Sequence, residues 1–100
     1  MTDQPAPIEL EMGYSPVEFA RVLPRAMRDW QVSGQSTHWS VSDRAGMQLA
    51  TIALDPRPER SIGALRVPVS RVRITFVDAA PEQMAELMRR FERGFHRGGG

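Results

Sequence analysis

Alternating apolar and polar residues predict β-strands in several parts of this chain. The alternation is found over residues 8–12, 37–42 and 69–77. Because successive side chains of a strand point to opposite faces of a sheet, each of these strands is expected to bury one side only. Two further segments, 47–54 and 61–67, are almost wholly apolar, and we predict them to be strands with apolar side chains on both faces.

Apolar residues at helical spacing predict a first helix that begins after Tyr14. Ser15 and Glu18 have the spacing of a capping box, in which each side chain accepts a hydrogen bond from the other residue's backbone amide. The apolar stripe then continues in phase to Trp30. Pro24 interrupts the backbone hydrogen bonds inside this stripe, so we expect either a kink there or two short helices.

A second amphipathic helix is predicted near the C-terminus, with Asp78 or Ala80 as its N-cap. Its apolar stripe comprises Met84, Leu87, Met88, Phe91 and Phe95. Glu86 and Arg90 are one helical turn apart and are expected to form an ion pair. The helix is expected to end at Gly94 or at the glycines that follow it.

Turn-forming residues separate these elements at residues 31–35, 43–46 and 55–59. The segment 43–46 ends in glycine and favours a hairpin turn. The segment 55–59 contains two prolines, so we predict a loop that does not pair. Pro68 is expected to cause a bend or a bulge before the strand at residues 69–77.

These elements together predict an α+β fold with a single, mainly antiparallel sheet of three to five strands. Two helices pack on one face of this sheet, and the elements follow the order β-α-β-β-β(β)-α. The chain has 100 residues, which suits one domain. We therefore expect one compact domain at residues 8–97, a disordered leader at residues 1–7 and a flexible glycine tail at residues 98–100.

The composition is that of an ordinary globular protein, with 41% hydrophobic and 25% charged residues. The chain contains no cysteine, which excludes disulfides and thiolate metal sites. The first residues are polar and contain proline, which is not typical of a signal peptide. No apolar run has the roughly 20 residues needed to cross a bilayer. A cytoplasmic protein without a membrane partner is therefore expected.

No residues with the spacing of a catalytic or metal site stand out. The two histidines, His38 and His96, lie on different predicted elements, whereas metal sites usually need several ligands at close spacing. The hydroxyl residues at 33–37 precede His38 but lack the strained turn of a serine nucleophile. We therefore predict a small non-enzymatic protein with no catalytic residue, no cofactor and no bound metal.

All 13 basic residues are arginine, yet the net charge is only +1. Arg71 and Arg73 are two residues apart on a predicted strand and therefore project from one face of the sheet. A row of arginines on an open sheet can bind phosphates, so nucleic-acid binding is the alternative function, with a nucleic acid as the partner. The residues for this alternative are Arg66, Arg71, Arg73, Arg89, Arg90, Arg93 and Arg97.

The two apolar strands provide the main functional hypothesis. If both helices cover one face of the sheet, the other face keeps apolar side chains exposed, and such patches commonly mark association surfaces. We predict an interaction or accessory protein that binds a protein partner, or a second copy in a homodimer, through this face. The predicted contact residues are Ala50, Ile52, Leu54, Leu65 and Val67. Three other outcomes stay open: the sheet curls around a second core, the N-terminal segment covers the apolar face, or a small apolar ligand is held between sheet and helices.

Overall fold

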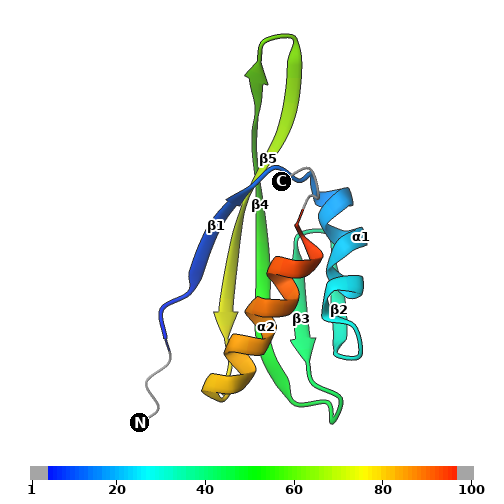
Figure 1. Ribbon diagram of the computed structural model, residues 1–100, viewed down its shortest axis with the longest axis vertical. Helices are drawn as coiled ribbons and strands as arrows, with labels where there is room; N and C mark the ends of the chain where they lie inside the picture. The colour runs from blue at the N-terminus through cyan, green and yellow to red at the C-terminus, as the bar shows by residue number, and fades with distance from the viewer. Residues whose placement is uncertain (1–4, 97–100) are drawn as a thin grey trace.

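The computed structural model describes residues 5–96 and contains one five-stranded antiparallel sheet with both helices in front of one face (Figure 1). The strands are β1 (Ile8–Met12), β2 (Gln31–Gln35), β3 (His38–Ser42), β4 (Gln48–Ile62) and β5 (Leu65–Phe76), in the spatial order β1-β5-β4-β3-β2. The helices are α1 (Pro16–Met27), after β1, and α2 (Pro81–Gly94), after β5. The predicted α+β fold is confirmed. Of the predicted terminal segments, residues 1–4 of the leader and the whole glycine tail lie outside the described residues.

The hydrophobic core lies between the sheet and the two helices. In β5, Val72, Ile74 and Phe76 are buried, whereas Arg71 and Arg73 are exposed, as the alternation predicted. Aromatic rings from the helices fill the space above these strands. The ring centroids of Phe19 and Phe95 are 4.7 Å apart, and those of Phe91 and Phe95 are 4.6 Å apart. A small apolar ligand would therefore have to displace packed side chains to lie between sheet and helices.

Helix α1 begins with the predicted capping box. The Glu18 amide donates to the Ser15 hydroxyl at 3.2 Å, and the Ser15 amide donates to the Glu18 carboxylate at 3.0 Å. The helix continues through Pro24 to Met27, so the alternative of two short helices is wrong. Pro24 lies on the exposed side of α1, and buried residues before and after it hold the helix against the sheet.

Helix α2 has Ala80 as its N-cap, which was one of the two predicted caps. The helix ends at Gly94, which was one of the two predicted ends. The alanine has no capping side chain. Instead, the Ala80 amide donates to the side-chain oxygen of Gln83 at 2.9 Å. Glu86 and Arg90 form the predicted ion pair at 2.8 Å.

Residues 31–35, predicted as a loop, form the edge strand β2, so that prediction was wrong. Pairing with β3 produces this strand although its own residues have little strand preference. Gly34 has φ 129° and lies opposite Trp39. A Cβ at this position would lie 2.8 Å from the Cα of Trp39, so the close approach of the two strands requires glycine.

The largest difference from the prediction is a single long hairpin that β4 and β5 form. We predicted a loop at residues 55–59 and a separate strand at residues 61–67, and both predictions were wrong. β4 runs unbroken to Ile62, turns at residues 63–64 and returns as β5. We call the outer part of this hairpin, residues 57–69, the arm; it projects beyond the helices (Figure 1).

The arm tolerates its prolines because its strands have only one neighbour each. Strand β3 reaches no further than Ala53 of β4, and β1 reaches no further than Ser70 of β5. Beyond these points, a proline can face the free side of its strand without removing a ladder hydrogen bond. Residues 58–59 lie opposite Pro68 in a β-bulge, where the pairing register shifts.

Candidate functional site

The sheet face that the helices leave uncovered is polar, and we call it the open face. Its central row crosses the sheet from Glu9 through Arg73 and Ala53 to His38. Arg73 donates to the Glu9 carboxylate at 2.6 Å, and this hydrogen bond is the main cause that lowers the pKa of Glu9 below its ordinary value. A shallow depression of about 410 Å³ lies over this row.

Three residues predicted to form the partner-binding face are instead part of the core. Ala50, Ile52 and Leu54 have exposed fractions of 0%, 1% and 4% and point toward the helices. Their placement on the uncovered face was wrong. The segment 47–54 is apolar on both sides, so its alternation does not indicate which set is buried. The pairing of β4 with β5, in which Ile52 lies opposite Ile74, decides which set of side chains faces the helices.

The other two predicted contact residues lie on the arm. Leu65 is exposed and Val67 is partly exposed. Residues two apart on β5 share a face, so Leu65, Val67 and Val69 lie on the same side as Arg71 and Arg73, away from the helices. Ile62 is paired with Leu65 and therefore also lies on this side.

The two sides of the arm carry different residues. One side carries the apolar row of Ile62, Leu65, Val67 and Val69, and it also carries Arg57 and Arg60, which pair with Val69 and Val67 nearer the base. The opposite side carries the paired Ser61 and Arg66. Ile62 and Leu65, at the tip, expose 56% and 67% of their surface. The sequence showed that these residues are apolar, but not that they lie at the end of a projecting hairpin.

A second apolar surface lies at the base of the arm, and we call it the base groove. It has a volume of about 450 Å³, and its apolar walls come from β1, from Tyr14 between β1 and α1, and from the end of α2. The residues of these walls are Leu10, Met12, Tyr14, Phe91 and Phe95, and Glu92 and His96 lie at the rim. The sequence offered no signal for this groove, because its walls are up to 85 residues apart along the chain.

Hydrogen bonds join the arm to the base groove. The buried Ser70 hydroxyl, where β5 leaves the arm, donates to the Tyr14 carbonyl at 2.7 Å. The Tyr14 hydroxyl donates in turn to the Phe95 carbonyl at 3.0 Å, and the two rings meet edge to face with centroids 5.1 Å apart. The orientation of the arm relative to the groove is therefore held by buried contacts.

The arginines considered for nucleic-acid binding do not form one surface. Arg71 and Arg73 lie on the open face, and Arg66 lies on the helix side of the arm. The other set belongs to α2, on the covered side of the sheet: Arg89, Arg90 and Arg93 are on this helix, and Arg97 lies outside the described residues.

The cations along the open face are largely neutralised by nearby carboxylates. Besides the pair of Arg73 with Glu9, Arg60 contacts Glu11 at 2.7 Å and Arg57 contacts Asp55 at 3.3 Å. A phosphate backbone would have to compete with these carboxylates for Arg57, Arg60 and Arg73.

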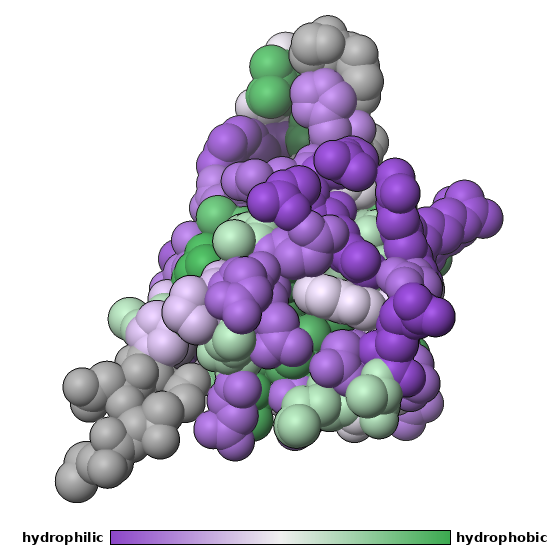
Figure 2. Space-filling view, turned by 60° about the horizontal axis from the view of Figure 1, so that its bottom comes forward, coloured by the Kyte–Doolittle hydropathy of each residue, from purple (hydrophilic) through white to green (hydrophobic). Residues whose placement is uncertain are grey.

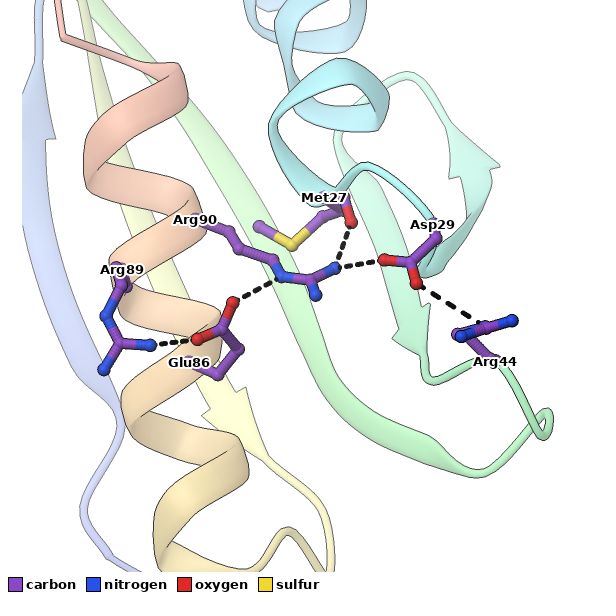
Figure 3. Close-up of polar contacts among 6 residues, drawn as sticks. All are labelled: Met27, Asp29, Arg44, Glu86, Arg89 and Arg90. Carbon is purple, nitrogen blue, oxygen red and sulfur yellow. Dashed lines mark hydrogen bonds and ion pairs between the residues drawn. The ribbon is translucent and has the colours of Figure 1, made fainter.

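Arg90 has a structural position between the two helices (Figure 3). Its guanidinium donates to the Met27 carbonyl at the end of α1 at 2.6 Å, to Asp29 at 2.8 Å and to Glu86 at 2.8 Å. It also lies 4.1 Å from the ring centroid of Trp30, in a cation–π contact. Burial alone would lower the pKa of Arg90, but its bonds to Glu86 and Asp29 outweigh that effect and raise it.

The histidines are separated in the structure, as the sequence suggested. His38 borders the depression of the open face, and its Nδ1 lies 3.1 Å from the Thr37 hydroxyl, whereas His96 borders the base groove. Among residues 5–96, no group of three or more histidine, aspartate or glutamate side chains could hold a metal ion. Within the same residues, no helix is both long and apolar enough to cross a membrane.

Comparisons with known proteins identify no relative of this chain. No protein-family model, curated protein or solved structure matches this chain.

Proposed function

We propose that this chain is a non-enzymatic binding protein whose arm makes the main contact with a protein partner. The observation that carries the proposal is the exposure of Ile62 and Leu65 at the tip of a projecting hairpin. Single exposed apolar residues are common on protein surfaces, but a contiguous exposed apolar patch commonly marks a contact surface, and Ile62 and Leu65 are cross-strand neighbours. The predicted contact residues Leu65 and Val67 remain part of this proposal, and Ile62 joins them.

The energetics of the arm support a role in binding. A two-stranded hairpin that packs on nothing is marginal at best, because its ordering costs backbone entropy and buries little apolar surface. Fully burying the tip side chains against a partner would gain about 1.5–3 kcal/mol for each. A long hairpin whose apolar residues are left in water therefore gains stability when a partner covers it.

A protein partner fits the arm better than a nucleic acid does. The arginines at the base of the arm, Arg57 and Arg60, are engaged by carboxylates of this chain. Figure 2 views the molecule mainly from the end remote from the arm, and the residues visible there are mostly hydrophilic, with hydrophobic ones in small groups. The support for a non-enzymatic role is that His38 and His96 border different depressions.

The test is capture of partners from a lysate of the source organism by three forms of the protein. In the arm variant, Ile62→Asp and Leu65→Asp are combined. In the control, Val17→Asp changes an equally exposed apolar residue on α1, with 68% exposure. We expect wild type and control to retain the same protein, and the arm variant to lose it while its urea unfolding midpoint stays unchanged.

Two results would contradict the proposal. In one, the arm variant retains every protein that wild type retains. In the other, the wild type retains nucleic acid in a salt-dependent manner, and the arginines rather than the tip are needed for it.

A further inference from the structure

We infer that the arm of one copy of this protein docks in the base groove of a second copy, and that the second copy returns the same contact. This inference rests on the proposed function, because it names the partner that the arm binds. The arm presents an apolar tip beside a cation, so its partner needs an apolar groove with a carboxylate at its rim. The chain itself carries such a groove.

The apolar parts of the two surfaces match. The tip offers Ile62 and Leu65, both more than half exposed. The base groove offers a volume of about 450 Å³ with apolar walls that include Leu10, Met12 and Phe91. Burial of aliphatic side chains against aromatic and thioether groups is favourable without any directional requirement.

The charges also match. Within residues 5–96, Arg66 on the arm and Glu92 at the groove rim are both exposed, and no ion pair of either is found there. Arg57 and Arg60, the other two arginines of the arm, are already paired with carboxylates of the same chain, so the charge match rests on Arg66. The positive charge of Arg66 on the arm and the carboxylate of Glu92 at the groove attract each other.

The position of the groove makes the contact reciprocal. The groove lies at the base of the same arm, tied to it through the Ser70–Tyr14–Phe95 hydrogen bonds. If two copies place their arms side by side in opposite directions, each tip comes to the base of the other arm, whatever the length of the arm. One two-fold axis then relates two identical contacts, and the assembly closes as a dimer.

Two contacts are needed for a stable dimer. The arm is two strands wide, about 10 Å, and its five or six residues per strand extend about 20 Å. One face of a ribbon of this size is well below the roughly 1,200–2,000 Å² that a stable interface buries in total. Reciprocal docking doubles the contact and adds the flanks of both arms.

The test combines analytical ultracentrifugation with charge reversal. We expect wild type to sediment as a dimer, and Arg66→Glu or Glu92→Arg alone to raise the dissociation constant at least about tenfold, because each places like charges together. Combining Arg66→Glu with Glu92→Arg should restore the wild-type constant. Both residues are exposed, so far-ultraviolet circular dichroism should show each variant folded. Arg93→Glu, on the same helical turn, is the matched control and should have less effect.

The outcomes separate this inference from the proposed function. A wild type that stays monomeric at about millimolar concentration overturns the inference, while arm-dependent capture of another protein would still support the proposed function. A dimer that survives Ile62→Asp with Leu65→Asp overturns the inference and removes the arm as its interface. A dimer that needs the tip but shows no rescue in the double reversal overturns the base groove as the docking site.

Discussion

Replacing Gly94 with alanine should destabilise this protein, although alanine is the better helix former. In the last turn of α2, Gly94 faces Ala26 of α1, a residue with 6% exposure. A Cβ at position 94 would lie 2.8 Å from the Cα of Ala26, and closer still to its Cβ. Ordinary carbon–carbon contacts are about 3.5–4.0 Å, so the helices would have to separate by about 1 Å.

The magnitude follows from two opposing effects. Alanine gains at most about 1 kcal/mol over glycine from helix propensity, and less at a helix end. Forcing an extra methyl group into a packed contact typically costs about 1–3 kcal/mol. Both helices are anchored to the sheet by buried residues, so they cannot separate freely. We expect Gly94→Ala to lower the free energy of unfolding by about 1–2 kcal/mol.

The assay is urea unfolding followed by circular dichroism. Arg93→Ala, on the exposed side of the same turn, is the control and should change stability by less than about 0.5 kcal/mol. Adding Ala26→Gly to Gly94→Ala should recover part of the loss, because it removes one of the two colliding atoms. A Gly94→Ala variant as stable as wild type, or a strictly additive double variant, would refute the close helix contact.

Two further predictions concern the core and the ion pairs. In urea unfolding, Phe76→Ala should lower the free energy of unfolding by about 3–5 kcal/mol, and Arg73→Ala should lower it by well under 1 kcal/mol. The reason is that Phe76 is 5% exposed, whereas the Arg73 side chain is 57% exposed. The reverse order would mean that β5 is one residue out of register. Hydrogen bonds from Arg90 lower the pKa of Glu86 and of Asp29 from their ordinary values of 4.5 and 3.8. A lowered carboxyl pKa contributes stability above the ordinary value, and this contribution is lost as the pH falls through the lowered one. The free energy of unfolding should therefore fall less between about pH 6 and about pH 3 in Glu86→Gln than in wild type. The same dependence of the free energy of unfolding on pH in both proteins would contradict the role of the Glu86–Arg90 pair.

Local signals in the sequence were sufficient for both helices. The capping box of Ser15 and Glu18 depends on residues three positions apart, and so does the ion pair of Glu86 with Arg90 within one turn. Such contacts are set by helix geometry and need no information from the rest of the chain. The strand that contains Val72, Ile74 and Phe76 was also predictable, because one of its faces is apolar and the other is charged.

The orientation of β4 and the existence of the arm were decided only by the tertiary structure. In the segment that contains Ile52 and Leu54, both faces are apolar, so burial could not be assigned until pairing with β5 set the register. Pro56 and Pro58 suggested a loop, since proline has no backbone N–H and cannot donate a hydrogen bond to a neighbouring strand. They are accommodated because β3 ends before them, which leaves one edge of β4 free.

The candidate site was likewise predictable only in part from the sequence. The sequence by itself determined which residues are apolar or charged, and hence that Leu65 and Val67 were candidates for a contact surface. It could not place them at the tip of a hairpin, nor assemble the base groove from Leu10, Tyr14 and Phe95. The physical reason is that alternation reports only which residues share a side of one strand. What covers that side depends on contacts between segments far apart in the chain, and these are set when the sheet and helices pack.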